Sequence, residues 1–290
     1  MSMSFSENIQ LDNRSIVASV KCEICFAAVA NDVLQLMNSG SGDARRLGAL
    51  ITSDQSLTAR VLKLANSPFY GFPRKINTVR DAVVVLGDKA LRNMVLAMAV
   101  KGLSANQGPV ERGLWEESAA FAIAARFIAT KIDLIHPEEA FMAGLMSNIG
   151  ETVCNLDTPK LYRRILTETK TSDLRQQGSA ALLPYPFTQL GAAILYDWNF
   201  SPMLVASTFY AETAELTGDR DDESFMLCCV VRLARQLCKS LGLGRYPEQP
   251  ALLSAEASAV VLGFDGEAVN ALRSEFADVF AETAAGLINS

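Results

Sequence analysis

The apolar residues of this chain recur at helical spacing, three to four positions apart, over nearly its whole length. One stripe, at positions i, i+4, i+7 and i+8, consists of Leu57, Val61, Leu64 and Ala65. No segment shows the convincing alternation that is typical of a strand. The pattern predicts helices over about 20–37, 43–51, 54–66, 78–87, 88–102 and 111–131, from 136 onward, and over about 158–170, 187–197, 202–214, 223–241, 252–262 and 267–287. The predicted fold class is therefore all-α.

Turn and polar residues divide this helical pattern into parts. Gly102 and the polar stretch 104–108 end a first lobe, and a second helical lobe follows. We expect a flexible tail at 1–17, one domain of two packed lobes at 18–220 (about 18–108 and 109–220), and a C-terminal helical extension at 221–290.

Composition narrows the class of protein. The chain has 290 residues, 50% hydrophobic and 20% charged, which predicts a folded protein with a sizeable core. A net charge of −6 argues against nucleic acid as a partner. No apolar run is long enough to span a membrane, and the polar N-terminus does not resemble a signal peptide, so we expect no membrane association and a cytoplasmic location.

Cysteine and histidine offer few candidates for metal chemistry. The six cysteines are interpreted as small core residues: Cys22, Cys25, Cys154, Cys228, Cys229 and Cys238. The CxxC spacing of the first two lacks a second pair, which makes it a poor zinc site. The only histidine, His136, precedes Pro137 at a predicted helix start, where capping or a surface role is expected.

The segment 54–71, with the sequence DQSLTARVLKLANSPFYG, resembles the HDOD domain family. The resemblance continues in order through 75–87, 114–118, 140–145 and 190–198, and covers roughly residues 20–215. It implies that the second lobe is related to the HD metal-dependent phosphohydrolases, which use metal-bound hydroxide.

The same resemblance implies which positions would hold the metal ligands. Ser147 and Asn148 stand where catalytic relatives carry the His-Asp pair. The full set of matched positions is Glu117, Ser147, Asn148, Phe187, Ala211 and Glu212. A multi-histidine site cannot be built from one histidine, so we expect no catalytic residues, no metal and no cofactor. Weak Mg²⁺ binding by Glu117 and Glu212 remains an alternative.

Two further groups of residues have open interpretations. The remnant of the HD pocket is either filled by side chains or able to bind a small anion or nucleotide. The signature of the first lobe either orders its own loop or forms a docking surface, and consists of Arg60, Asn66, Ser67, Tyr70, Gly71, Arg74 and Lys75. Arg80 and Lys63 extend this group into a basic strip that suits an acidic partner.

The resemblance implies a bacterial signal-transduction module without hydrolase activity. Such a module would bind signalling proteins, which the sequence does not identify. The alternatives are a sensor of a nucleotide or cyclic dinucleotide in the HD pocket and a residual metal-dependent phosphohydrolase.

Overall fold

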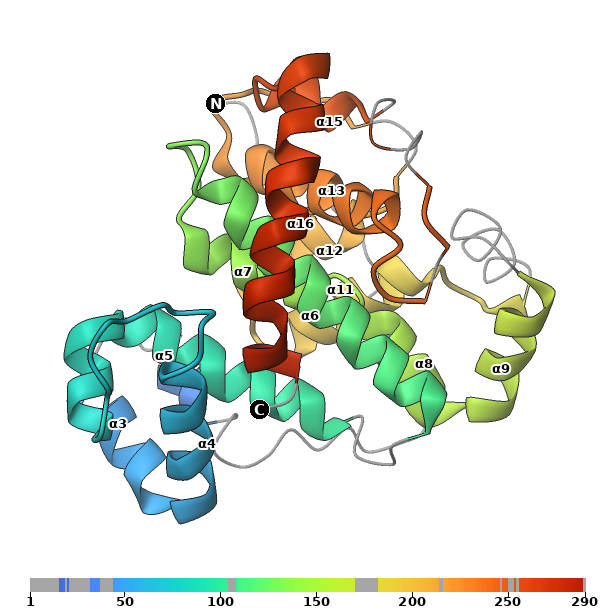
Figure 1. Cartoon of the computed structure of the whole chain (residues 1–290). Helices are drawn as coiled ribbons and strands as arrows, with labels where there is room; N and C mark the ends of the chain where they lie inside the picture. The colour runs from blue at the N-terminus through green and yellow to red at the C-terminus, as the bar shows by residue number, and fades with distance from the viewer. Residues whose placement is uncertain are drawn as a thin grey trace. The chain divides into compact units, whose positions relative to one another are not determined.

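The structure is a computed structural model that describes residues 16–18, 20, 32–36, 44–103, 108–169, 182–213, 216–245, 247–249, 253 and 256–288. These residues form helices and connecting turns, with no strand among them, which confirms the all-α prediction (Figure 1). Two compact units are present. The larger contains residues 1–24 and 106–277, and the smaller contains 25–105 and 278–290.

The smaller unit is built from α3 (Ala44–Ser53), α4 (Gln55–Ala65) and α5 (Val79–Leu103), which pack on one another. The last turns of α16 (Gly266–Ile288) belong to this unit, where Lys101 Nζ donates to the Ile288 carbonyl at 2.8 Å. The predicted stripe that begins at Leu57 and ends at Ala65 is buried, as the helical spacing indicates.

Local capping explains where these helices begin and bend. The Asp54 carboxylate accepts a hydrogen bond from Leu57 N at 3.0 Å and caps α4. Thr78 Oγ1 accepts from Asp81 N at 3.0 Å at the start of α5. Gly87 has a positive φ of 80° and interrupts α5, as predicted from its position between two helical stretches.

The larger unit packs around α6 (Pro109–Ala129), which α7 (Pro137–Met146), α8 (Ile149–Asp157) and α13 (Glu223–Ser240) contact (Figure 1). α8 also contacts α9 (Pro159–Glu168) and α11 (Phe187–Asp197). α12 (Pro202–Phe209) contacts α11 and α13, and α13 contacts α15 (Ala257–Val261). Because α13 packs on α6 and α7, this helix, which lies after residue 220, is part of the core of the larger unit.

Two glycines allow the helices of the larger unit to approach closely. A Cβ at Gly144 of α7 would lie 2.4 Å from the Phe121 carbonyl oxygen of α6. A Cβ at Gly150 of α8 would lie 1.9 Å from the Phe187 carbonyl oxygen of α11. Backbone therefore packs against backbone at both contacts, which leaves no room for a side chain.

The helix that opens at His136 has the predicted start. His136 Nδ1 accepts from Glu138 N at 3.1 Å, and Pro137 follows in the first turn. The helix ends at Met146, however, and α8 begins at Ile149. The sequence pattern does not predict α8 as a separate helix, because the turn at Ser147-Asn148 contains neither glycine nor proline.

Other expectations fall partly outside the described residues. Most of the predicted helix 20–37 and most of the tail 1–17 lie there, although Ile16 is buried. Cys22 and Cys25 lie there as well. Cys154, Cys228, Cys229 and Cys238 are buried free thiols, and burial raises the pKa of Cys154 and of Cys229 to about 11. Among the described helices, none combines the length and the apolar character needed to cross a membrane.

Candidate functional site

The larger unit contains a group of buried and mostly buried polar side chains, which we call the polar centre. It consists of Glu117, Ser147, Asn148, Glu151, Tyr162, Glu212, Arg235, Lys239 and Arg245. Four of these residues are among the positions that the resemblance matched to metal ligands: Glu117, Ser147, Asn148 and Glu212. The structure thus brings together positions that are up to 95 residues apart in the chain.

Glu117 lies at one end of the polar centre, on α6, with 1% of its surface exposed. Its Oε2 atom accepts from Asn148 Nδ2 at 3.2 Å and from Arg245 Nε at 2.9 Å. Asn148 occupies the N-cap position of α8 but makes no side-chain cap bond, because its amide is directed at Glu117. This carboxylate is therefore held by an amide and a guanidinium group.

Arg245 joins Glu117 to a second carboxylate, Glu151 of α8. Its Nη2 atom lies 3.0 Å from Glu151 Oε2 and also contacts Glu117 Oε2. Tyr162 of α9 donates its hydroxyl proton to Glu151 Oε2 at 2.5 Å and accepts from Arg245. Phe187 packs edge-on against Tyr162, with ring centroids 5.9 Å apart, so it forms an apolar wall beside the polar centre.

Glu212 lies at the other end of the polar centre, beside the buried residue Ala211. It contacts Arg235 Nη2, and Lys239 Nζ lies 3.6 Å away. Burial alone would raise the pKa of Glu212, but the charges of Arg235 and Lys239 outweigh it and hold the pKa below its usual value. Glu212 is therefore ionised and paired in the folded protein.

Arg235 connects Glu212 to the turn between α7 and α8. Its Nη1 atom donates to Ser147 Oγ at 3.2 Å and to the Ser147 carbonyl at 3.3 Å. The guanidinium carbon lies 4.5 Å from the centroid of the Phe121 ring, a cation–π contact. Ser147 is thus a hydrogen-bond partner of an arginine.

Five residues of the polar centre were missed in the sequence: Glu151, Tyr162, Arg235, Lys239 and Arg245. A signal for two of them was present, because Arg235 and Lys239 lie four positions apart on a helix whose other buried residues are mostly apolar. The other three have no pattern of their own, and only the packing of distant segments brings them together.

The polar centre does not suit an HD-type metal ion. Such a metal needs several carboxylate and imidazole ligands that face it together. Here arginine guanidinium groups hold oxygens of Glu117, Glu151 and Glu212. Within the described ranges, no three His, Cys, Asp or Glu side chains converge as metal ligands would.

Asn66 of the smaller unit orders the signature loop. Its Oδ1 accepts from Ile76 N at 2.7 Å, and its Nδ2 donates to the carbonyls of Ile76 at 2.8 Å and Leu62 at 2.7 Å. Both backbone groups of Ile76 are satisfied by this one side chain. The loop between α4 and α5 is therefore fastened at both ends.

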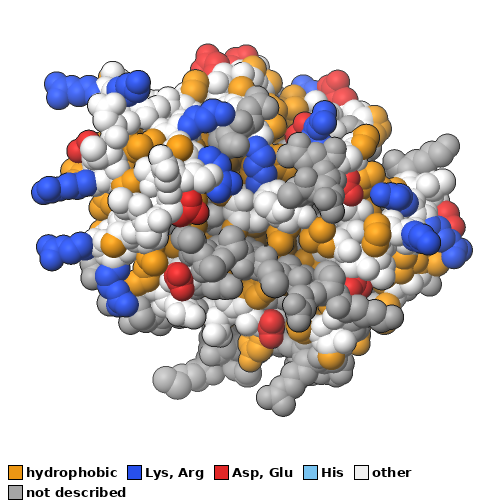
Figure 2. Space-filling model, turned by 90° about the horizontal axis from the view of Figure 1, so that it is seen from below, with side chains coloured by type: hydrophobic (Ala, Val, Ile, Leu, Met, Phe, Trp, Pro, Cys, Tyr) orange, Lys and Arg blue, Asp and Glu red, His pale blue; other side chains and the backbone are white. Residues whose placement is uncertain are grey.

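The other signature residues differ in exposure. Ser67 is buried against Gly286, Tyr70 is half-buried with its ring edge-on to Phe69, and Gly71 has a φ of 62°. The basic residues are exposed: Arg60, Lys63, Arg74, Lys75 and Arg80. Figure 2 shows Lys and Arg side chains that project from the surface at its left. The loop is thus internally ordered and carries positive charge outward.

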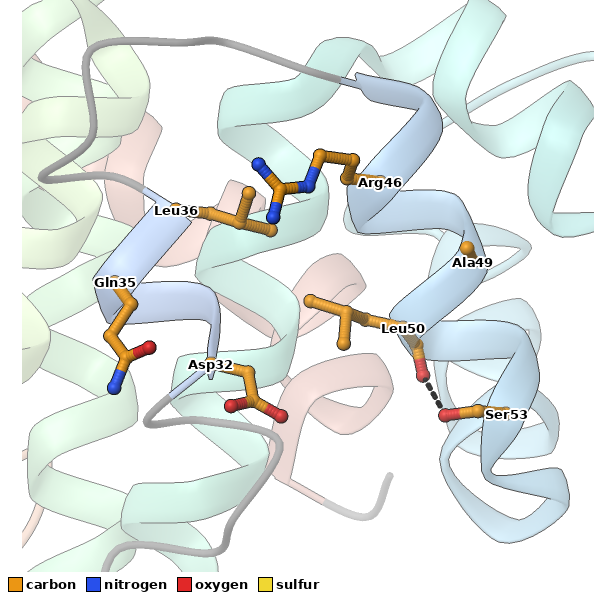
Figure 3. A pocket seen from close by; sticks show the side chains of 7 residues that line it. All are labelled: Asp32, Gln35, Leu36, Arg46, Ala49, Leu50 and Ser53. Atoms are coloured by element: carbon orange, nitrogen blue, oxygen red, sulfur yellow. Dashed lines mark hydrogen bonds between the residues drawn. The ribbon is translucent and has the colours of Figure 1, made fainter.

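A cleft of about 600 Å³ lies in the smaller unit between residues 32–36 and α3 (Figure 3). Its lining consists of Asp32, Gln35, Leu36, Arg46, Ala49, Leu50 and Ser53. Arg46 extends from α3 toward Leu36, and Ser53 Oγ donates to the Leu50 carbonyl at 2.7 Å. No residue singled out in the sequence lines this cleft.

A family model and a solved structure both match this chain to the same family, the HDOD domain. A family model described as the HDOD domain matches residues 25–214. The structure of an HDOD domain protein with unknown function from Geobacter sulfurreducens is 24% identical, covers 95% of each chain and has a TM-score of 0.80. A candidate phosphohydrolase from Shewanella amazonensis SB2B is 22% identical, covers 95% of this chain and 97% of that one, and has a TM-score of 0.71.

A curated relative also matches part of the chain. It is an uncharacterised protein from Treponema pallidum (strain Nichols), 22% identical over 153 residues. The match covers 52% of this chain and 30% of that protein, so the chain corresponds to less than a third of the length of that relative. At 24% and 22% identity, the two solved structures show that they share the fold with this chain. The activity in the name of the second describes that protein and is not transferred to this chain.

Proposed function

This chain belongs to the HDOD domain family, and on that premise we propose that it is a regulatory module that binds signalling proteins and does not hydrolyse phosphate esters. The observation that carries the proposal is the polar centre, in which the candidate ligand positions are engaged by Arg235 and Arg245. An HD hydrolase needs a cation at this place to generate hydroxide and to balance phosphate charge.

The surface of the smaller unit supports the binding half of the proposal. The two segments of this unit, 25–105 and 278–290, contain ten Lys and Arg and seven Asp and Glu, a net charge of +3 in a chain whose net charge is −6. Exposed charges of one sign steer a partner of opposite charge and favour its correct orientation. Because Asn66 fixes the loop that carries Arg74 and Lys75, the positive charges are presented on an ordered backbone. We therefore propose that the partner is a protein with an acidic surface.

The absence of hydrolase activity is tested on the whole chain. Phosphate release is measured from a panel of nucleotides and cyclic dinucleotides with Mg²⁺ or Mn²⁺, with elemental analysis of the purified protein. The expected result is no turnover above that of a Glu117→Gln variant. Metal-dependent turnover that is lost on Glu117→Gln would overturn this half of the proposal.

The binding half is tested by crosslinking and capture from cells of the source species. The Arg74→Glu and Lys75→Glu double variant is expected to lose the partners that the unmodified chain captures. The matched control reverses two exposed charges of the larger unit, Lys160→Glu and Arg163→Glu. Equal capture by both double variants would count against a docking surface on the smaller unit.

A sensor of nucleotides or cyclic dinucleotides is the alternative, and a thermal-shift panel discriminates it. A ligand at 100 times its Kd would stabilise the fold by about 2.7 kcal/mol. To bind in the polar centre, such a ligand would have to displace Arg235 or Arg245 from buried carboxylates. We expect no shift with any nucleotide, and a shift that Arg245→Lys alters would favour the sensor.

A further inference from the structure

Arg245 reaches the polar centre from a segment that follows α13, and we call residues Leu241–Arg245 the plug. The plug lies beyond residues 25–214, the part of the chain that the family model matches. Arg245 contacts Glu117 of α6, Glu151 of α8 and Tyr162 of α9. One guanidinium group from outside the matched region thus joins three helices within it.

The end of α13 directs the plug toward Glu117. Gly242 N donates to the Lys239 carbonyl at 3.1 Å and Leu243 N donates to the Cys238 carbonyl at 3.0 Å. These two bonds, with a φ of 66° at Gly242, form a Schellman motif that ends the helix and reverses the chain. Gln249 N donates back to the Lys239 carbonyl at 3.1 Å, so the chain after the plug also returns to α13.

Glycines make room for the plug. A Cβ at Gly244, where φ is 93°, would lie 3.1 Å from both Cβ and Cγ of Glu117. A Cβ at Gly113 of α6 would lie 2.8 Å from Cγ of Arg245. The plug backbone and the arginine stem therefore pack directly on α6, one turn apart. This close fit leaves the Arg245 side chain only 12% exposed.

The charges around Arg245 indicate what it replaces. Two carboxylates, 1% and 5% exposed, share the one guanidinium group. Buried carboxylates of this kind need a positive charge, whether it comes from a side chain or from a bound cation. Glu117 Oε1 is buried and has no hydrogen-bond partner in the described structure, so one oxygen at this place remains available to a ligand.

We propose that Arg245 is the permanent counter-ion of Glu117 and Glu151 and excludes a divalent cation from a latent site that these two carboxylates form. The ligand class follows from the donors, because carboxylate oxygens, the Asn148 amide and the Tyr162 hydroxyl are hard ligands suited to Mg²⁺, Mn²⁺ or Ca²⁺. This inference deepens the proposed function and rests on it, since it gives the reason why the polar centre is not a working metal site.

The test uses thermal unfolding of the full chain with and without Mn²⁺. Arg245→Ala removes the counter-ion and opens space between the carboxylates. Its midpoint is expected to fall by on the order of 10 °C. Saturating Mn²⁺ is expected to restore about half of that loss in the variant and to leave the unmodified chain unchanged. Adding Glu117→Gln to Arg245→Ala is expected to abolish the Mn²⁺ effect.

Companion variants separate charge from packing. Arg245→Lys keeps the charge and is expected to retain most of the stability without responding to Mn²⁺. Arg245→Met keeps the volume without the charge and is expected to lose stability with little Mn²⁺ response. Arg232→Ala is the matched control, because Arg232 is also mostly buried but pairs with the single carboxylate of Glu256. It is expected to destabilise the fold without any Mn²⁺ rescue.

Three outcomes would overturn the inference. The first is an Arg245→Ala or Arg245→Met variant as stable as the unmodified chain. The second is a Mn²⁺ shift in the unmodified chain as large as that in Arg245→Ala. The third applies if Arg245→Ala folds neither with nor without Mn²⁺. In that case, an Arg245→Lys variant that also fails to fold would overturn the inference. None of these outcomes bears on partner capture, so the binding half of the proposed function stands or falls separately.

Discussion

The polar residues of the two units are held in different ways. In the larger unit, charged side chains are buried and pair with one another, as Arg235 and Arg245 do with three glutamates. In the smaller unit, Asn66 bonds to the backbone, and Arg74 and Lys75 are exposed. A buried charge is costly unless it is paired, whereas an exposed charge is solvated at little cost. Charges of the first kind maintain the fold, and charges of the second kind remain available to a partner.

The largest effect is expected at the buried pair of Arg235 and Glu212. Arg235→Ala removes the main positive charge beside Glu212 and the donor to Ser147. Urea unfolding at neutral pH should show a loss of about 3–5 kcal/mol in the free energy of unfolding. Arg164→Ala, which removes an exposed pair with Glu168, should leave the unfolding midpoint unchanged.

The pH dependence of this loss is a separate check. In the unmodified chain the pKa of Glu212 is lowered, so its contribution is present at neutral pH and is lost as the pH falls. Without Arg235, burial and the nearby Glu151 oppose Lys239 alone, and we expect the pKa of Glu212 to rise. The stability gap between variant and unmodified chain should then narrow from about pH 7 to about pH 4. A gap that stays constant over this range would contradict the assignment.

The second effect concerns the backbone contact beside the polar centre. Gly150→Ala places a methyl group 1.9 Å from the Phe187 carbonyl oxygen, so α8 and α11 must separate. We expect a loss of about 3 kcal/mol by urea unfolding. Gly102→Ala is the control in the smaller unit, where an added Cβ meets nothing within 4 Å, and it should be neutral or slightly stabilising. Equal effects would show that this contact is not close-packed.

A smaller effect is expected at the signature loop. Asn66→Ala leaves the amide and carbonyl of Ile76 without their side-chain partner, and Ile76 is buried. The expected loss is about 1–2 kcal/mol, with faster hydrogen exchange in residues 67–77. Asn77→Ala, at an exposed position, is the control and should change neither quantity.

The smallest effect on stability is expected at Arg74 and Lys75, the two residues that are proposed to bind the partner. The Arg74→Glu and Lys75→Glu double variant should change the free energy of unfolding by less than about 0.5 kcal/mol, because both side chains are exposed. A loss as large as that of Asn66→Ala would mean that these charges support the loop itself, and it would remove the contrast between the two units.

Local signals predicted much of the helical framework. Asp54, Thr78 and His136 are helix starts that their own neighbours determine, since a cap bonds within three residues. The break at Ser147-Asn148 was not predicted, although serine and asparagine are common in turns and at helix starts, because these two residues were interpreted only as replaced ligand positions. The Asn148 side chain makes no cap bond to α8 and donates instead to Glu117, which is 31 residues away in the chain.

The sequence by itself determined that the chain is helical, that it has the HDOD pattern, and that one histidine cannot build a multi-histidine metal site. The helical character follows from the spacing of apolar residues, and the argument about the metal site follows from the count of histidines. The HDOD pattern is a resemblance carried by local motifs such as residues 54–71. None of the three needs long-range information. Only the tertiary structure decided which side chains contact the positions that the resemblance matched to metal ligands. Arg235 and Arg245 come from the chain beyond residue 214, and only the packing of α13 on α6 and α7 brings their charges to the buried glutamates.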